Sequence, residues 1–369
     1  MTDSWAPMDV ASRPARLRTR LPDAGVDALL VTRLPNIRYL TGFTGSAALL
    51  LVTPDALVFI TDGRYQTQAH EQLDAVGVDA RVEIGATSAE QHDLLAAAVG
   101  PHGRLGLEAH GVTWAQHRTL APLVAADLVA TDGLVEDLRR VKDPGEVARI
   151  RAACTIADDA LAELLPTLAD APREREFAVE LEYAMRRRGA SAMSFDPIVA
   201  AGPNAAKPHA RPTDRPIGPG ELVVIDFGCV VDGYCSDMTR TVSVDDPGPE
   251  ARRLWDLVAA SQQAGRDAVH AGVACADVDR ASRAVIEDAG FGDQFVHGTG
   301  HGVGLEIHEA PRVARTAPGT LDVGTVVTVE PGVYLPGVGG VRIEDTVVVT
   351  TDGAAPLTEA PKSLVVARH

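Results

Sequence analysis

The chain is poor in aromatic side chains and in positive charge. Only 4% of its 369 residues are aromatic, so aliphatic residues must provide most of the core within the 46% hydrophobic fraction. Lys and Arg number 34 against 51 Asp and Glu, which gives a formal net charge of -17. This excess of negative charge argues against nucleic acid or an anionic membrane as a partner, and it is typical of a soluble protein.

Cysteine is also scarce, and long apolar runs are absent. The four cysteines form no CxxC pair and are too few for a disulfide framework in a chain of this length. No run approaches the ~18 apolar residues of a membrane span. The first twenty residues, MTDSWAPMDVASRPARLRTR, lack the apolar core of a signal peptide. These absences predict a cytoplasmic protein that contacts no membrane.

The chain is long enough for two domains, and its pattern changes near residue 135. Short apolar runs alternate with helical stretches before that point, which predicts a smaller α/β domain over residues 1–134. The predicted strands cover 26–32, 47–53, 56–65, 105–107 and 128–130, and the predicted helices cover 66–75 and 88–98.

Residues 135–369 have an α+β pattern. Asp143-Pro144-Gly145-Glu146 is a turn that opens a helix, because proline suits the first helical position. Further helices are predicted at 174–188, 249–271 and 275–289, and strands at 222–231, 234–244, 325–330 and 340–350.

Two aspartates lie on a predicted hairpin closed by Asp232-Gly233, a strong turn signal. A two-residue loop places Gly228 opposite Asp237 and Asp226 opposite Thr239. Asp226 and Asp237 then share a face as diagonal neighbours, ~7–8 Å apart at the backbone. Two divalent ions ~3.5–4 Å apart fit between such carboxylates, and Gly228 leaves space for them. A β-bulge would change this register, and two solvated aspartates are the alternative.

Other charges interrupt apolar strands in the same half of the chain. Glu330 ends TVVTVE, and Glu344 lies in GGVRIEDTVVV. Burying a carboxylate without a partner costs several kcal/mol, so a bound cation is one explanation and a strand end in solvent is the other. Arg342 shares a face with Glu344 and either forms a surface ion pair or orients a ligand carboxylate.

Three histidines occur within HGTGHGVGLEIHE, residues 297–309. The segment is neither an HExxH helix nor a GxGxxG loop, and its glycines allow close approach of backbone to a ligand. His209, in GPNAAKPHARP, carries little weight by itself. Four carboxylates and one imidazole suit two hard divalent ions, which together can activate a shared water near neutral pH. The residues therefore predict a metallohydrolase.

At this point the sequence resembles the pita-bread metallopeptidases: methionine aminopeptidase, aminopeptidase P and prolidase, with creatinase as a metal-free relative. The segments VVIDFG…SDMTRT, VHGTGHGVGLEIHE, TVEPGVY and GVRIEDT follow one another in the order of that family. TGFTGS and TDGRY resemble the N-terminal domain of the aminopeptidase P, prolidase and creatinase branch. The resemblance implies a C-terminal pita-bread catalytic domain, preceded by an α/β creatinase/prolidase-type domain that covers the cleft and mediates dimers.

The resemblance also implies a set of metal ligands. Asp226 would bind the first ion, Asp237 and Glu344 would bridge both ions, and His301 and Glu330 would complete the second site. The ions would be Mn²⁺ in preference to Co²⁺ or Zn²⁺, because the ligands are rich in oxygen.

Further residues would line the substrate site. His209 and His308 would stabilise the scissile carbonyl and its tetrahedral intermediate, while His297 and Arg342 would lie near the substrate. Glu330 would also exchange protons with the nucleophilic water.

The resemblance implies hydrolysis of the peptide bond that precedes proline, a bond without an amide N–H. An aminopeptidase P-like activity on longer proline-containing peptides is favoured over a prolidase, which cuts Xaa-Pro dipeptides only. A metal-free creatinase-like hydrolase and a binding protein on the same fold are further alternatives. A homodimer is expected.

Overall fold

The computed structural model describes residues 5–100 and 103–366, which form two compact units. One unit is Met8–Arg139, and the other is Arg140–His369 together with the segment before Met8. The boundary between the two units lies five residues after position 134, where the sequence pattern placed the end of the first domain. Within the described ranges, no helix combines the length and apolarity needed to cross a membrane.

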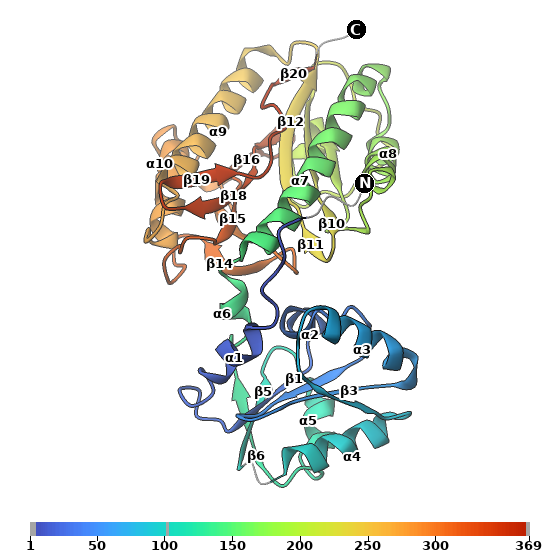
Figure 1. Ribbon diagram of the computed structural model, residues 1–369. Helices are drawn as coiled ribbons and strands as arrows, with labels where there is room; N and C mark the ends of the chain where they lie inside the picture. Colours follow the sequence, from blue (N-terminus) through green and yellow to red (C-terminus); the bar gives the residue numbers. More distant parts are fainter. Residues whose placement is uncertain (1–4, 101–102, 367–369) are drawn as a thin grey trace. The chain divides into compact units, whose positions relative to one another are not determined.

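The described strands of the unit Met8–Arg139 form a six-stranded mixed sheet in the order β4-β3-β2-β1-β5-β6. Figure 1 labels β1, β3, β5 and β6 of this sheet. The central strand β1 pairs antiparallel with β2 and parallel with β5. The strands are β1 (Ala28–Val31), β2 (Leu49–Val52), β3 (Leu57–Thr61), β4 (Arg81–Ile84), β5 (Arg104–Glu108) and β6 (Asp127–Thr131). The helices are α1 (Arg13–Arg18), α2 (Leu34–Thr41), η1 (Gly63–Tyr65), α3 (Gln66–Ala75), α4 (Ser88–Val99), α5 (Trp114–Leu120) and α6 (Glu136–Arg139).

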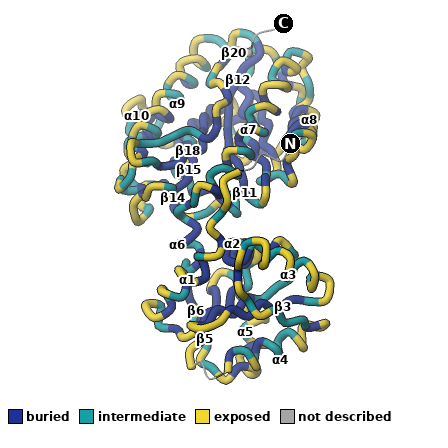
Figure 2. The backbone as a smooth tube through the Cα atoms, in the orientation of Figure 1, coloured by how far each residue is buried: buried dark blue, intermediate teal, exposed yellow. Residues whose placement is uncertain are grey.

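The core of this unit is aliphatic, as the shortage of aromatic residues requires. Leu30 and Leu51 from the sheet pack with Leu95 of α4 and Leu120 of α5 in one buried cluster. Figure 2 shows the sheet as mainly buried, with exposed residues concentrated on the helices and loops around it. The α/β pattern predicted for this part of the chain is therefore present.

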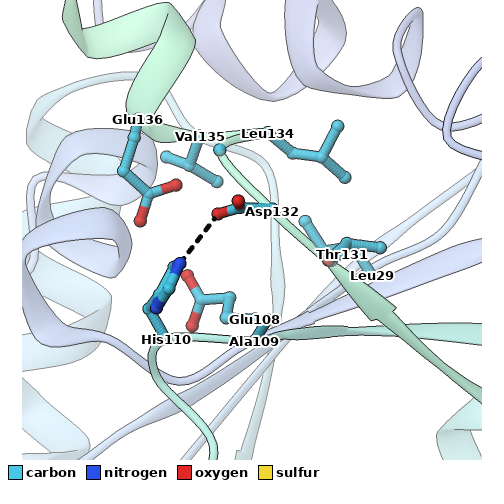
Figure 3. Close-up of a pocket in the computed structure, with 10 residues that line it drawn as sticks. Leu29, Glu108, Ala109, His110, Thr131, Asp132, Leu134, Val135 and Glu136 are labelled. Atoms are coloured by element: carbon cyan, nitrogen blue, oxygen red, sulfur yellow. Dashed lines mark ion pairs between the residues drawn. The ribbon is translucent and has the colours of Figure 1, made fainter. Parts of the chain in front are cut away.

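A small pocket in this unit lies beside the end of β5 (Figure 3). Its volume is about 10 Å³, enough for about one water molecule. The carboxylate of Glu108 there already accepts hydrogen bonds from the Thr32 and Arg33 amides and from Asn36. This carboxylate holds the start of α2 in place. The space beside it is too small for a substrate.

The described residues from Arg140 onward form four sheets, in the orders β11-β10-β7, β20-β12-β9-β8, β14-β13-β15-β18-β19 and β16-β17. Its helices are α7 (Pro144–Leu164), η2 (Leu165–Asp170), α8 (Glu174–Arg187), η3 (Gly202–Ala206), α9 (Gly248–Ala268), α10 (Cys275–Asp288) and η4 (Gly292–Gln294). Its strands are β7 (Ala192–Met193), β8 (Ile198–Ala201), β9 (Leu222–Phe227), β10 (Cys229–Val231), β11 (Tyr234–Cys235), β12 (Met238–Val244), β13 (Gly300–Gly302), β14 (Glu309–Val313), β15 (Val326–Val329), β16 (Gly332–Leu335), β17 (Gly339–Arg342), β18 (Asp345–Thr350), β19 (Gly353–Pro356) and β20 (Val365–Val366).

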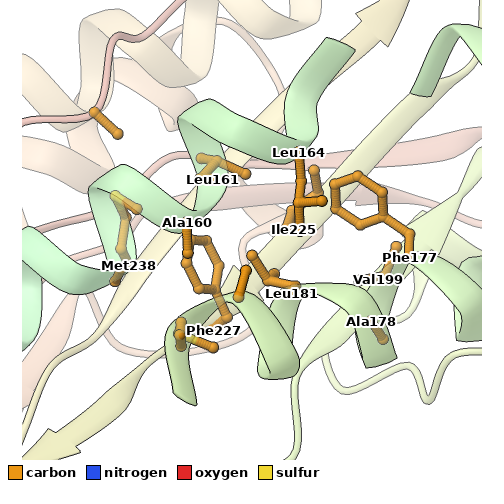
Figure 4. Packing of buried hydrophobic residues seen from close by; sticks show 14 of the residues in the cluster. Ala160, Leu161, Leu164, Phe177, Ala178, Leu181, Val199, Ile225, Phe227 and Met238 are labelled. Carbon is orange, nitrogen blue, oxygen red and sulfur yellow. The ribbon is translucent and has the colours of Figure 1, made fainter. Parts of the chain in front are cut away.

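Helices flank the strands of this unit on two sides, α7 and α8 on one and α9 and α10 on the other (Figure 1). Leu161 of α7 and Leu181 of α8 pack against Ile225 of β9 (Figure 4). The start of α7 is fixed by a capping box between Asp143 and Glu146, as the sequence predicted. The α+β class with a smaller α/β domain in front is confirmed.

The register of the predicted hairpin is confirmed. Thr239 pairs with Asp226, and Val231 pairs with Tyr234, so the count is the same on both sides of the interruption near Gly228. The role assigned to Gly228 was wrong, however. A Cβ atom there would lie 1.9 Å from the carbonyl oxygen of Ser236, so glycine is needed for the close approach of the facing chain and not to leave space for metal.

The single strand predicted over residues 340–350 is wrong. It is two strands in different sheets, because β17 pairs with β16 while β18 pairs with β15 and β19. Ile343 and Glu344 occupy the break between them. The amide of Glu344 donates to the carbonyl of Thr239 at 3.1 Å, so the chain at this point is held by β12.

Candidate metal centre

Four of the five predicted ligands lie within a few ångströms of one another. Asp237, His301 and Glu344 each offer a ligand atom, and these atoms lie within 4.8 Å of one another. Nε2 of His301 lies 3.5 Å from Oδ2 of Asp237 and 3.3 Å from Oε1 of Glu330. These side chains come from four segments: the break between β11 and β12, the middle of β13, the residue after β15 and the break before β18.

Asp226, the fifth residue, belongs to the same charged cluster. Its Oδ2 accepts a hydrogen bond from Arg342 at 2.5 Å, whereas its Oδ1 is buried and has no hydrogen-bond partner among the described residues. Glu344 shows the same pattern. Its Oε2 accepts a hydrogen bond from the Thr239 hydroxyl at 2.7 Å, whereas its Oε1 is buried and has no partner in the same described ranges. Because an unpartnered buried carboxylate oxygen is costly, both atoms fit a site built for cations.

The electrostatics of the cluster also suit a cation. Burial, and then the charges of Glu344 and Asp226, hold the pKa of Asp237 well above its ordinary value. Burial likewise raises the pKa of Glu344 well above its usual range, and raises that of Glu330 to about 7. Carboxylates that repel one another in a buried space bind protons or metal ions, and divalent ions relieve the repulsion.

His301 is positioned by a short strand between two others. Gly300, its neighbour on β13, has no room for a side chain, since a Cβ atom would lie 2.0 Å from the carbonyl oxygen of Thr328 on β15. Here a glycine of the histidine segment lets strands approach each other, and not backbone approach a ligand as the sequence suggested. Nδ1 of His301 contacts the carbonyl of Gly302 at 3.1 Å, which leaves Nε2 directed at the carboxylates.

His308 and His209 come to this cluster from separate loops. The rings of His301 and His308 meet edge to face with centroids 4.4 Å apart. Burial, followed by the charge of His301, lowers the pKa of His308, so its imidazole is neutral near pH 7. His209 is exposed and near enough to influence the pKa values of both His308 and Glu330. The two histidines therefore lie beside the carboxylates with a face toward solvent.

His297 and Arg342 are joined to the cluster through Tyr334, which the sequence analysis missed. Nε2 of His297 lies 2.9 Å from the Tyr334 hydroxyl, and Arg342 donates to that hydroxyl at 2.7 Å and to Asp226. Burial lowers the pKa of His297 to about 4, and its Nδ1 contacts the carbonyl of Gly298. Arg342 is buried, so its pairing with Asp226 is not a surface ion pair. Arg342 thus contacts Asp226 directly, whereas His297 is linked to it only through Tyr334 and Arg342.

Arg312 is a second residue that the sequence analysis missed. It lies on β14 directly opposite His301, so the two side chains share a face of the sheet. It is exposed, and within the described parts of the chain no hydrogen bond or ion pair occupies its guanidinium. In a chain with a net charge of -17, a free cation beside a candidate catalytic centre is a candidate for anion recognition.

Comparisons with known proteins agree with this geometry. Residues 148–351 match metallopeptidase family M24, and residues 13–141 match the creatinase/prolidase N-terminal domain. An Xaa-Pro dipeptidase structure from Bacillus anthracis is 38% identical with a TM-score of 0.92, covering 97% of this chain and 100% of that one. An X-Pro aminopeptidase structure from Thermotoga maritima is 34% identical with a TM-score of 0.86, covering 96% and 100%.

A relative compared by sequence also spans nearly the whole length. The Xaa-Pro dipeptidase of Pyrococcus horikoshii is 32% identical over 342 residues, which is 92% of this chain and 95% of that protein. The chain therefore belongs to metallopeptidase family M24 and carries the creatinase/prolidase N-terminal domain in front of its peptidase domain.

Proposed function

We propose that this protein hydrolyses dipeptides of the form Xaa-Pro with the help of two divalent metal ions. The observation that carries the proposal is the gathering of five side chains from different segments of the chain, two of which keep a buried oxygen without a partner among the described residues. The proposed ligands are Asp226, Asp237, His301, Glu330 and Glu344. Their mixture of carboxylates and one imidazole suits Mn²⁺ or Co²⁺.

Bound divalent ions would supply a water nucleophile near neutral pH and polarise the scissile carbonyl. The protein's own groups then handle the charge and the protons. The neutral ring of His308 can donate a hydrogen bond to the carbonyl oxygen as negative charge develops on it, and His209 can approach from the exposed side. A carboxylate oxygen of Glu330 would accept the proton of the attacking water and pass it to the proline nitrogen as the bond breaks.

The sequence motifs alone favour an aminopeptidase P-like activity, but two further observations favour a dipeptidase. The relatives from Bacillus anthracis and Pyrococcus horikoshii are both named Xaa-Pro dipeptidases. Arg312 lies opposite His301 with its charge unpaired by any described residue, so it can bind the carboxylate of a C-terminal proline. An Xaa-Pro aminopeptidase is the second candidate, supported by the similarity to the Thermotoga maritima enzyme.

The test is a paired assay of the purified protein with added Mn²⁺. Leu-Pro should be cleaved much faster than Leu-Pro-Gly, and metal analysis should find two ions per chain. Preferential cleavage of the tripeptide would identify the aminopeptidase instead. Turnover that survives removal of all metal would favour a creatinase-like hydrolase, and no turnover with no bound metal would favour a binding protein.

Several finer expectations stay predictions. They are the choice of Mn²⁺, the homodimer, the cytoplasmic location, and a role of the N-terminal domain in covering the active site.

A further inference from the structure

A buried carboxylate outside the proposed metal site is surrounded by positive charge. Asp345 is the residue after Glu344, and its side chain is only 2% exposed. Five donors converge on its two oxygens: Arg240 at 2.9 Å and Thr358 at 3.2 Å on Oδ1, and Gln262 at 3.0 Å, Arg266 at 2.9 Å and Lys362 on Oδ2. Three cations thus share one anion. We call Asp345, Arg240, Arg266 and Lys362 the ionic hub.

The hub is connected to the proposed ligand Glu344 through Arg240. The Arg240 guanidinium donates to the carbonyl oxygen of Glu344 and, at 3.0 Å, to that of Thr239. Thr239 in turn donates its hydroxyl to Oε2 of Glu344. Every polar group of Glu344 except Oε1 is therefore held by β12, and the free oxygen has one orientation.

The C-terminal segment completes the hub from outside the sheets. The carbonyl oxygen of Ala360 accepts from Arg240 at 2.7 Å, and Lys362 reaches Asp345 and also Gln262 at 3.1 Å. The segment itself is fixed to α7, because the carboxylate of Asp158 accepts from the amides of Glu359 and Ala360. Residues remote in sequence thus determine where Arg240 lies.

The acceptors of Arg240 connect the hub to the backbone of the proposed ligand Glu344. A buried guanidinium needs a full set of acceptors, and Arg240 obtains them from Asp345 and from backbone carbonyls. The charge of Arg240 also acts on the carboxylate of Asp158. One of the carbonyls that Arg240 binds belongs to Glu344, so a change in the hub that moves Arg240 also moves the backbone of the proposed ligand.

We infer that Lys362 and the other hub cations are positioning residues for the metal site, which set the affinity for metal through Glu344 without contacting metal or substrate. The inference rests on the proposed function, since it takes Glu344 to be a ligand. Groups that orient metal ligands change metal affinity by roughly tenfold to a hundredfold when they are removed.

The test is Lys362→Met, which keeps the volume of the side chain and removes its charge. The Mn²⁺ dissociation constant, measured by calorimetry on metal-free protein, should rise roughly tenfold or more. At saturating Mn²⁺ the kcat should stay within about twofold of the wild type, because the catalytic groups are unchanged. Lys362→Arg should restore the affinity. Arg252→Met is the matched control, since Arg252 forms an exposed ion pair with Asp246 on the same unit.

An unchanged Mn²⁺ dissociation constant in Lys362→Met would overturn the inference, as would a loss of kcat that saturating metal does not restore. If Lys362→Met does not fold, Arg266→Met is judged by the same criteria, since Arg266 is partly exposed at 21%. Failure of the proposed function gives a different result, because the wild type itself would then bind no Mn²⁺ at this site.

Discussion

Asp237 is one of the buried carboxylates of the proposed site. Its pKa is raised by burial and by the charges of three neighbouring acids. If it bridges two ions, Asp237→Ala should remove both and lower the activity more than about 100-fold. Metal analysis and Leu-Pro hydrolysis check this, with Asp246→Ala as the control because Asp246 is 72% exposed. A variant that retains two ions would show that Asp237 is not a bridging ligand.

His308 separates metal binding from catalysis. Its ring stacks edge to face on His301 but makes no hydrogen bond to a carboxylate of the cluster within the described residues. His308→Ala should therefore keep the full metal content and lower kcat by roughly 10²–10³-fold, the usual loss when a donor to a developing oxyanion is removed. Loss of metal from this variant would contradict the role proposed here.

Arg312 gives a prediction about substrate length. A charge-assisted hydrogen bond contributes about 1.5–3 kcal/mol, so Arg312→Gln should lower kcat/KM for Leu-Pro roughly 10- to 100-fold. The same variant should leave hydrolysis of Leu-Pro-amide unchanged, because that substrate has no terminal carboxylate. Arg315→Gln is the control, since Arg315 already pairs with Glu287. An equal loss on both substrates would assign Arg312 to another role.

At the scale of single residues, the sequence pointed to charged residues that lie within apolar strands. Asp226 stands out because a charge in VVIDFG has no local explanation. Tyr334 and Arg312 could not be found in this way. A tyrosine in a short apolar strand looks like core, and an arginine after a proline looks like surface. Their importance depends on partners that only the folded chain brings near.

At the scale of elements, strong local turn signals predicted strand pairing correctly. The points at which the chain passes from one sheet to another could not be predicted. Asp232-Gly233 determined the hairpin register, because a two-residue turn leaves one way to pair the strands. The break at Glu344 was invisible, since the residues on both sides favour strand and the switch depends on which neighbours β17 and β18 find. The edge strand β4 was missed because it is only four residues long, RVEI, and its two apolar residues are too few to form a clear pattern.

The packing of β13 against β15 can be tested with a single methyl group. Gly300→Ala would place a Cβ atom 2.0 Å from a backbone oxygen, so one strand must move. We expect a loss of roughly 1–3 kcal/mol in stability from overpacking, together with weaker Mn²⁺ binding because His301 moves with the strand. Urea denaturation and calorimetry measure the two effects. Gly63→Ala is the control, because a Cβ atom there meets nothing within 4 Å.

Equal stability and affinity in Gly300→Ala and Gly63→Ala would mean that β13 can shift without disturbing His301.

At the scale of the molecule, the acid cluster predicts how metal and pH together determine stability. The pKa of Glu330 is raised by burial from 4.5 to about 7 in the folded metal-free protein. Such a group favours the fold below its unfolded pKa, and this contribution is lost as pH rises through 7. Metal needs the deprotonated form, so it replaces the proton as pH rises. The increase in Tm caused by Mn²⁺ should therefore grow from pH 5 to pH 8.

Thermal melts with excess Mn²⁺ and with chelator, taken at each pH, measure this difference and cancel the contributions of distant groups. Asp237→Ala should show little increase at any pH. An increase in Tm that shrinks toward pH 8 would contradict the proposed coupling.

The proposed ligands come from widely separated segments, and this has a consequence for how the peptidase domain loses metal when it partly unfolds. No described loop or hairpin carries more than two of the five proposed ligands, so local unfolding at any of these segments should release the proposed ions. Resistance of the ions to chelators should therefore report the integrity of the whole domain. A preparation that loses them at neutral pH should have loosened somewhere between β9 and β18, even if its helices still give a normal spectrum.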